Sequence, residues 1–244
     1  EKYMAKYLVI LLLLALASSA HSLTYYTGPG EDAGQMLSTL KPGDTLVFKD
    51  GTYDRAVSIS VSGTEQSPIT IKADHSKSAV FDGHGTKQYA LLLDGAAFVK
   101  ISGFLIKGFT KNGIKPSGCD NMTIADVEVT ECKKAGIRLE GCSNTLIKKV
   151  YVHHVKSTGV LIAPGSEDIT VEDSESCYND DGRGRKGDAD GFACNDNTHN
   201  ITVRRCKSHH NSEDGFDFRA TGTMTIDSCI AIHNGATGMK LWKG

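Results

Sequence analysis

Residues 122–147, MTIADVEVTECKKAGIRLEGCSNTLI, hold one full unit of a repeat and the beginning of the next. The segment Met-Thr-Ile at residue 122 returns as Thr-Leu-Ile at residue 145, and similar apolar–polar–apolar segments follow and precede it. A unit this short cannot bury its own apolar face, so successive units must stack on one another. The central apolar residue recurs after 23, 23, 24, 32 and 23 residues, at Ile101, Ile124, Ile147, Val171, Val203 and Ile226.

A second column of the repeat is a glycine followed by an apolar residue. We interpret each unit as two short alternating strands separated by polar turns, with apolar side chains inward and polar ones outward. The sequence therefore predicts an all-β fold, a right-handed parallel β-helix solenoid with coils of about 23 residues that spans residues 23–244. The glycines of this column are Gly113, Gly136, Gly159, Gly191, Gly215 and Gly238.

Equivalent positions of neighbouring coils should lie about 4.8 Å apart, so columns of the alignment predict spatial neighbours. Asn179, Asn211 and Asn234 align after the first strand, where asparagine tolerates a left-handed backbone and can hydrogen-bond along the stack. Cys206 aligns with Cys229, and Cys119 aligns with Cys142. Because parallel neighbours rarely suit disulfide geometry, we expect buried free thiols.

The two ends of the sequence differ from the repeat. Lys6 followed by the apolar run Leu8–Ala17 and small residues predicts a signal peptide over residues 1–22, and therefore secretion; residues 1–3 precede Met4 as extra leader residues. Residues 31–40 predict a short helix that covers the N-terminal end of the solenoid. No terminal cap follows the last coil, so we expect residues 23–244 to be a β-helix domain that is incomplete at its C-terminus.

Composition excludes several classes of function. The formal net charge is −2 and no basic field is present, which argues against nucleic-acid binding. Beyond the leader, no segment is apolar enough to predict a membrane span. We expect a monomer.

The fourth repeat carries about nine extra residues, 180–188, and acidic residues follow directly after them. Aligning the glycines places Asp190 beneath Asp214, with Glu213 in the same turn and Asp217 outward on the next strand. A single Asp before glycine is usually a solvated turn residue. Several carboxylates within a few ångströms repel one another, however, unless some are protonated or a cation lies among them.

All-oxygen ligands favour Ca²⁺ over zinc or copper. We therefore expect oxygens of Asp190, Asp214 and Asp217 to converge on one Ca²⁺ site, with Glu213 nearby. Lys240 falls in the column of Asp217, one coil later. A surface lysine is usually just solvated, but a cation beside it would favour the neutral amine and make it a candidate base.

The remaining polar residues give weaker signals. Arg204, Arg219 and Lys243 are candidates to line a groove for an anionic polymer, although solvation is the commoner role of each. His153, His154, His209, His210 and His233 fall in or near one column without zinc-like spacing. We interpret these histidines mainly as structural or groove residues.

Three segments resemble the pectate lyases of polysaccharide lyase family nine: Asp188-Ala-Asp190-Gly-Phe-Ala, Asn211-Ser-Glu213-Asp214-Gly-Phe-Asp217 and Asn234-Gly-Ala-Thr-Gly-Met-Lys240-Leu. They cover roughly the last 60 residues in matching order. The resemblance implies a Ca²⁺ site formed by Asp190, Glu213, Asp214 and Asp217, and Lys240 as catalytic base. This sequence departs from the family in having Glu213 in place of Asp, and residues 241–244 in place of a glycine-rich continuation.

The resemblance implies a secreted pectate lyase that cleaves polygalacturonate, an acidic polysaccharide, by β-elimination. An alginate or glycosaminoglycan lyase or a uronate epimerase of the same fold is the first alternative. The second is a carbohydrate-binding solenoid or adhesin without catalysis, which needs the carboxylates but not the base.

Overall fold

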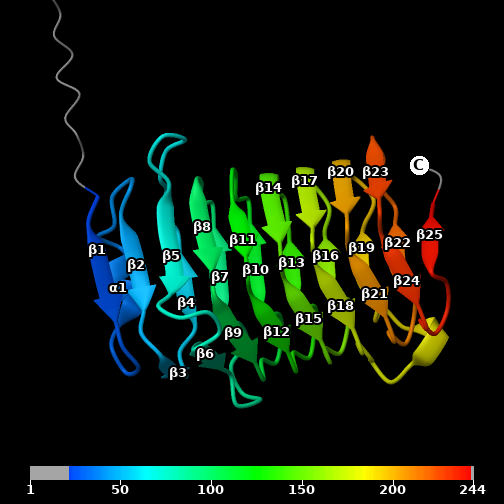
Figure 1. The fold of residues 1–244 in the computed structure, drawn as a ribbon, viewed down its shortest axis with the longest axis horizontal. Helices are drawn as coiled ribbons and strands as arrows, with labels where there is room; N and C mark the ends of the chain where they lie inside the picture. The colour runs from blue at the N-terminus through cyan, green and yellow to red at the C-terminus, as the bar shows by residue number, and fades with distance from the viewer. Residues whose placement is uncertain (1–21, 243–244) are drawn as a thin grey trace, which may run out of the picture.

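Three parallel β-sheets wind around one apolar core in the computed structural model, which describes residues 22–242 (Figure 1). Each full coil gives one strand to sheet A, then one to sheet B and one to sheet C, so neighbouring strands in a sheet come from successive coils. The predicted parallel β-helix is confirmed. The predicted signal peptide lies outside the described residues, apart from Ser22, as does the end of the chain after Trp242.

Sheet A consists of β1 (Thr24–Thr27), β2 (Thr45–Phe48), β5 (Ile69–Ala73), β8 (Val99–Ser102), β11 (Thr123–Ala125), β14 (Ser143–Lys148), β17 (Glu167–Glu172), β20 (His199–Arg204) and β23 (Met224–Asp227). Sheet B consists of β3 (Gly51–Tyr53), β6 (Ala79–Asp82), β9 (Phe104–Lys107), β12 (Glu128–Thr130), β15 (Tyr151–His153), β18 (Glu175–Cys177), β21 (Lys207–His209) and β24 (Ile230–Ile232). Sheet C consists of β4 (Val57–Ile59), β7 (Leu91–Asp94), β10 (Ile114–Ser117), β13 (Ile137–Leu139), β16 (Val160–Ile162), β19 (Phe192–Cys194), β22 (Phe216–Phe218) and β25 (Met239–Leu241).

The observed register matches the columns of the sequence repeat. In sheet A, Ile124 pairs with Ile101 and Ile147, and the ladder continues to Val171, Val203 and Ile226. Ile101, Ile124 and Ile147 are fully buried, Val171 and Val203 are 1% exposed, and Ile226 of the last coil is half-buried. Burial of each such side chain stabilises the fold by about 1.5–3 kcal/mol.

The expectation of two strands per coil is wrong, because every complete coil has three. The strand that the sequence hides is the short one in sheet B, which in the central coils spans only three residues and places one side chain inward. That inward residue changes from Val129 and Val152 to Ser176 and Ser208, all buried. A three-residue strand with a serine inside carries almost no alternating apolar signal.

The glycine column is required by close packing rather than by backbone conformation. A Cβ on Gly159 would overlap Oγ of Ser176, and one on Gly191 would overlap Oγ of Ser208. These glycines do not have positive φ, so an added methyl group is excluded by space alone. In each of these coils the turn from sheet B to sheet C therefore packs directly against the inward serine of the next coil's sheet B strand.

The asparagine ladder is confirmed, with one correction. Oδ1 of Asn211 accepts from the backbone N–H of Asn179 at 3.2 Å, and Oδ1 of Asn234 accepts from that of Asn211 at 3.2 Å. The left-handed residue, however, is the one before each asparagine: Tyr178, His210 and His233 have φ of 53°, 55° and 53°. The inward asparagine carries the hydrogen bonds, while its outward neighbour makes the turn.

All seven cysteines are free thiols, as expected for aligned parallel neighbours. Six are buried and Cys229 is half-buried. At the N-terminal end, the predicted helix is shorter than expected: α1 spans Ala33–Leu37, capped by Asp32, whose Oδ1 accepts from the N–H of Gly34 at 3.0 Å. Its buried residues Ala33 and Leu37 join the core beside β4.

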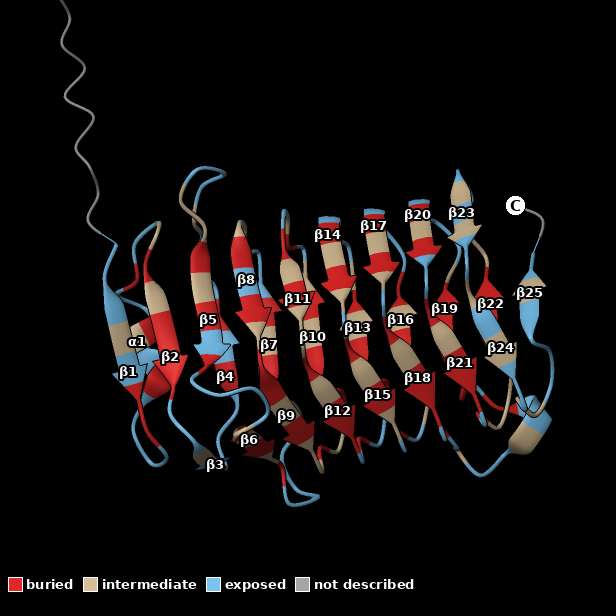
Figure 2. Cartoon of the chain, viewed as in Figure 1, coloured by how far each residue is buried: buried red, intermediate tan, exposed pale blue. Residues whose placement is uncertain are grey.

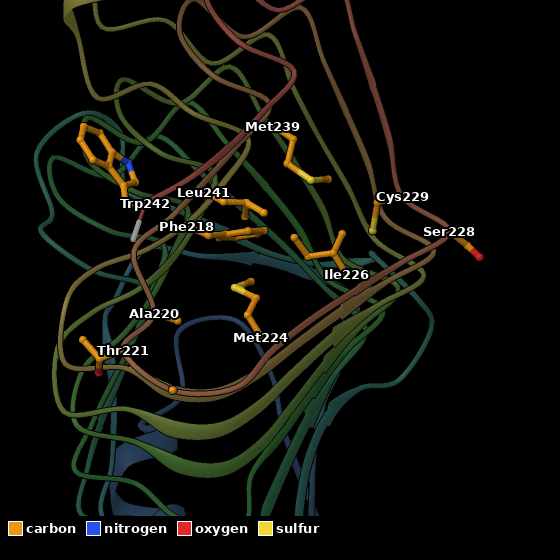
Figure 3. Close-up of a pocket in the computed structure, with 11 residues that line it drawn as sticks. Phe218, Ala220, Thr221, Met224, Ile226, Ser228, Cys229, Met239, Leu241 and Trp242 are labelled. Atoms are coloured by element: carbon orange, nitrogen blue, oxygen red, sulfur yellow. The ribbon is translucent and has the colours of Figure 1, made fainter. Parts of the chain in front are cut away.

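The core opens at the other end of the described chain, where the last coil is pale in the burial view (Figure 2). Inward side chains of β22, β23 and β25 line a hollow of about 790 Å³ there (Figure 3). Leu241 is 61% exposed and Met239 39% exposed, although both occupy inward positions of the repeat. No element among residues 22–242 covers this end, and no helix in that range is long and apolar enough to cross a membrane.

Candidate active site

The candidate site lies on sheet C, at its last coils and in the turns that lead into them. One outward column of this sheet holds the residue two positions after each column glycine. Its paired members include Arg138, Leu161, Ala193, Asp217 and Lys240. The predicted alignment of Lys240 with Asp217 is therefore confirmed by the strand register.

Asp190 and Asp214 occupy equivalent turns that precede β19 and β22. Oδ1 of Asp190 accepts from the backbone N–H of Asp214 at 3.0 Å, and Oδ1 of Asp214 accepts from that of Thr237 at 2.7 Å. One oxygen of each carboxylate thus stabilises the turn of the following coil. The stacking of these turns fixes both side chains and leaves their second oxygens for other partners.

The second oxygen of Asp214 is the least satisfied polar atom of this site. Oδ2 is buried and has no hydrogen-bond partner among the described residues. The cation paired with it is Nζ of Lys240 at 3.4 Å, which forms an ion pair with Oδ2 without a well-directed hydrogen bond. Asp214 as a whole is only 1% exposed. A buried carboxylate oxygen without a donor costs free energy, and a bound cation would remove that cost.

Three carboxylates converge here: ligand oxygens of Asp190, Glu213 and Asp214 all lie within 4.8 Å of one another. Burial first, and then the charges of Glu213, Asp217 and Asp214, raise the pKa of Asp190 to about 7. Burial first, and then the charge of Asp214, raise the pKa of Glu213 to about 7. Both shifts reflect burial first and the neighbouring negative charges second, and the oxygen-only donor set fits Ca²⁺.

Asp217 lies beside this group but not within it. Its Oδ2 accepts from Nη2 of Arg219 at 3.2 Å, and its Oδ1 accepts from the indole N–H of Trp242. We expected Asp217 to converge with Asp190 and Asp214, but in the structure the third converging carboxylate is that of Glu213. The reason is that Trp242 and Arg219 both donate to the Asp217 carboxylate.

Trp242 is a site residue that the sequence reasoning missed. Its ring centroid lies 4.4 Å from Nζ of Lys240 and 4.6 Å from the guanidinium carbon of Arg219. The exposed indole therefore contacts two cations and donates its N–H to Asp217. The one hint in the sequence was that residues 241–244 depart from a glycine-rich pattern. Which residues Trp242 contacts depends on where the chain turns after β25.

A groove of about 620 Å³ runs from Asp217 and Arg219 along sheet C toward the earlier coils. Asp190, Asp217 and Arg219 line one end, and Lys134 and Arg138 line the other. Arg138 was also missed, although counting two residues on from each column glycine would have found it. Four aspartates line the groove as well, so its three basic side chains are separate points at which carboxylates of a polymer could pair, and the groove as a whole is not basic.

Other expected groove residues lie elsewhere. Arg204 is on sheet A, where its Nη2 is 2.6 Å from Oε2 of Glu172, so its predicted groove role is wrong. Lys243 falls outside the described residues. The histidines lie on sheet B and in the turn that follows it, away from the residues that line the groove.

The insertion at residues 180–188 forms a loop with one turn of 3₁₀ helix, η1 (Gly184–Lys186). Arg183 holds its shape, since its Nη2 lies 2.7 Å from Asp181 and 2.6 Å from Asp188. Asp188 also lines the groove, and its charge contributes to the raised pKa of Glu213. The loop thus places an additional carboxylate at the rim of the site.

Fold and site together define a class: parallel β-helix proteins with a carboxylate cluster and a lysine beside a groove of mixed charge. A family model described as "Pel9A-like, right handed beta helix region" matches residues 26–244. The chain belongs to this family, and the match supports the expected right-handed coil. No protein of curated function matches the sequence at a significant level.

Solved structures with the same fold include three polysaccharide lyases. An alginate lyase from Paenibacillus sp. str. FPU-7 has a TM-score of 0.61 at 16% identity, covering 91% of this chain and 98% of that one. The pectate lyase Pel9A has a TM-score of 0.58 at 21% identity, covering 88% of this chain and 55% of that one. A rhamnogalacturonan lyase has a TM-score of 0.64 at 15% identity, covering 91% and 69%. At these identities the likeness concerns the fold.

Proposed function

We propose that this chain is a secreted polysaccharide lyase that cleaves polygalacturonate by β-elimination. Lys240 is the base, Asp190, Glu213 and Asp214 hold the Ca²⁺, and Asp217 lies beside this site, where it accepts from Arg219 and Trp242. The observation that carries the proposal is the buried oxygen of Asp214, which has no hydrogen-bond donor and lies 3.4 Å from the Lys240 ammonium. A carboxylate cluster alone would serve a binding protein equally well, whereas the adjacent amine supplies a base.

Ca²⁺, when bound, would neutralise a uronate carboxylate and acidify the proton on the neighbouring C5. Lys240, once deprotonated, accepts this C5 proton. The electron pair left behind forms the C4–C5 double bond while the bond from C4 to the glycosidic oxygen breaks. The departing oxygen takes a proton from solvent, and no water is added to the sugar. The paired carboxylates that a glycosidase needs are therefore not required.

The groove residues bind and orient the polymer. Arg219 lies next to Asp217 and beneath Trp242, where it can pair with a uronate carboxylate close to the base. Lys134 and Arg138 lie several coils away in the same groove and would hold carboxylates of sugars further along the chain. Trp242 contacts both Lys240 and Arg219 and so links the base to the end of the groove.

Family membership and the lyases among the neighbours support polysaccharide lyase activity, and pectate as substrate is the finer proposal. An alginate or glycosaminoglycan lyase, or a uronate epimerase, would use the same base because each reaction begins with removal of the C5 proton. A carbohydrate-binding solenoid or adhesin would need the carboxylates without the base. The placement of Lys240 against Asp214 favours an enzyme over a binding module.

The deciding experiment measures the ultraviolet absorbance of unsaturated product. The full chain is given polygalacturonate or alginate, with Ca²⁺ or with a Ca²⁺ chelator. We expect product from polygalacturonate only, and only with Ca²⁺. Product from alginate alone would move the assignment to the first alternative. Binding of either polymer without any product would favour the non-catalytic solenoid.

A further inference from the structure

A second group of ligand-type side chains lies on the outer face of sheet B, on a different sheet from Asp217 and Lys240. Glu175 and Cys177 are on β18, and His209 is on the adjacent strand β21, where it pairs with Cys177 (Figure 1). One ligand atom from each of the three lies within 4.8 Å of the other two. Ser176 and Ser208 point inward between them, so all three ligand side chains share the outer face.

The His209 ring is held by a hydrogen bond at each nitrogen. Nε2 lies 2.7 Å from Oε1 of Glu175, and Nδ1 lies 2.8 Å from Nδ1 of His210. With Nε2 directed at Glu175, we assign His209 as the donor of the Nδ1 contact with His210. Histidines that bind metals typically donate their other N–H in this way.

We propose that Glu175, Cys177 and His209 form a binding site for a zinc-type divalent transition-metal ion. The set combines a thiolate, an imidazole and a carboxylate, the donors that Zn²⁺ takes in proteins and that Ca²⁺ does not. The ion would replace the proton shared between Nε2 of His209 and Glu175, and the thiol proton of Cys177. Both protons pass to solvent, so affinity rises with pH.

The surroundings of the cluster support a specific, shielded site. Cys177 is fully buried, and His209 is 7% exposed. The phenol oxygen of Tyr151 lies 3.6 Å from the Cys177 sulfur and covers it on one side. Nζ of Lys207 lies 3.7 Å from Oε1 of Glu175 and competes for that carboxylate. Removal of the Lys207 charge should therefore strengthen metal binding.

The chain provides its own comparison two coils earlier. His153 has the same pair of contacts, with Glu128 at 3.3 Å on Nε2 and His154 at 2.7 Å on Nδ1. At the position that corresponds to Cys177, this earlier set has Thr130, whose Oγ1 lies 3.2 Å from Nδ1 of His153. The chief difference between the two sets is that Cys177 offers a sulfur atom where Thr130 offers a hydroxyl oxygen. A threonine thus fits the position, and Cys177→Thr is a variant that should fold.

The site has a structural consequence for the candidate active site. Cys177 and His209 are 32 residues apart, and the coil between them contains the insertion and Asp190. A metal ion that joins the two would tie together the ends of the longest coil in the regular part of the solenoid. Because it binds the folded state, it would raise the unfolding temperature.

The test uses Co²⁺ as a spectroscopic probe on the reduced, chelator-treated full chain. One equivalent of Co²⁺ should give the near-ultraviolet charge-transfer band of a cobalt–thiolate bond. Zn²⁺ should displace that band, while excess Ca²⁺ should not. Cys177→Thr should abolish it, His209→Asn and Glu175→Gln should weaken affinity by about tenfold or more, and Lys207→Gln should tighten binding. Cys229→Ser, a thiol outside the cluster, is the matched control and should keep the band.

Several results would overturn the site. They are a folded full chain without the band, a band that persists in Cys177→Thr, and a band lost in Cys229→Ser. Thermal unfolding supplies a second readout: Zn²⁺ should raise the unfolding temperature of the parent chain and leave that of Cys177→Thr unchanged. Equal shifts in both proteins would also contradict the proposal.

Discussion

At the scale of single residues, Lys240 is the group on which the proposed chemistry depends. Lys240→Ala should reduce elimination by a factor of about 10² to 10⁴, the usual contribution of a positioned base, with the fold retained. Lys240→Arg should fail as well, because a guanidinium stays protonated. Product formation from polygalacturonate measures both variants. Lys72→Ala, on the exposed face of β5, is the matched control and should be as active as the parent.

The ion pair between Lys240 and Asp214 allows a second measurement on Lys240, that of Ca²⁺ affinity. Nζ of Lys240 lies 3.4 Å from the Asp214 oxygen that a cation would use, so lysine and Ca²⁺ compete for it. Calorimetry should show that Lys240→Ala binds Ca²⁺ as well as the parent or better. Turnover equal to the parent, or a loss of Ca²⁺ affinity, would place the base elsewhere and make Lys240 a structural partner of Asp214.

Asp190 gives a prediction on pH. Its pKa is raised to about 7 in the folded protein, so between its ordinary value near 4 and about 7 the folded state binds more protons than the unfolded state. Without Ca²⁺, stability should therefore fall as pH rises through this window, by up to about 1.4 kcal/mol per pH unit for one group. Denaturant titrations at several pH values measure this slope.

Two comparisons accompany the pH experiment. Asp190→Asn should flatten the slope, and Ca²⁺ should flatten it too, because the ion favours the charged carboxylates that folding otherwise disfavours. Ca²⁺ affinity should itself rise with pH up to about 7, since binding expels protons from Asp190 and Glu213. A slope of opposite sign in the Ca²⁺-free parent would show that these carboxylates are already neutralised by another group.

Sequence alone could predict most of the candidate site at this scale. Counting from the repeated glycines is enough to place Asp190 under Asp214 and Lys240 beside Asp217. The same count does not reveal that Asp217 turns toward Trp242 and Arg219, since that depends on side-chain hydrogen bonds made after the last strand. Register is encoded in the repeat, whereas the partner of each outward side chain is not.

At the scale of secondary-structure elements, the turn from sheet B to sheet C is the tightest part of each coil. Gly191→Ala should destabilise the protein by about 1–3 kcal/mol, the usual cost of overpacking, because its Cβ would overlap Ser208. Since Gly191 follows Asp190 directly, Ca²⁺ affinity should fall too. Thermal unfolding and Ca²⁺ calorimetry measure the two effects.

The last coil offers the matched control for this substitution. Gly238 occupies the same column, but a Cβ there would meet only Ala231 at 3.4 Å, an ordinary contact. Gly238→Ala should therefore leave the unfolding temperature nearly unchanged. If both variants unfold alike, the column reflects backbone entropy and not close packing.

Elements were predictable in proportion to their length and regularity. The strands of sheets A and C have recurrent apolar anchors and could be placed from the sequence. The strands of sheet B in the central coils have three residues and a single inward side chain, and in β18 and β21 that side chain is a serine. In the first coils the register offset is 25 residues between Thr45 and Thr70 and 30 between Ile69 and Val99, which conceals the period.

At the scale of the whole molecule, stacking of coils converts the 23-residue repeat into a line of side chains along the solenoid. Arg138, Leu161, Ala193 and Asp217 are successive members of one outward column. Three strand spacings separate the first from the last, or roughly 14 Å. A polymer in this groove would meet the base at one end and Arg138 several sugars away, so substrate length becomes a structural variable.

This spacing gives the last prediction. Arg138→Gln should raise KM for polygalacturonate several-fold with little change in kcat, because Arg138 contributes binding far from the reacting bond. Oligosaccharides too short to reach from Lys240 to Arg138 should show no such effect. Arg204→Gln removes the same charge from sheet A, outside the groove, and should change neither constant. A KM increase that is equal for the shortest substrates and the polymer would mean that Arg138 acts through general electrostatics, and the substrate would then not follow the column of sheet C.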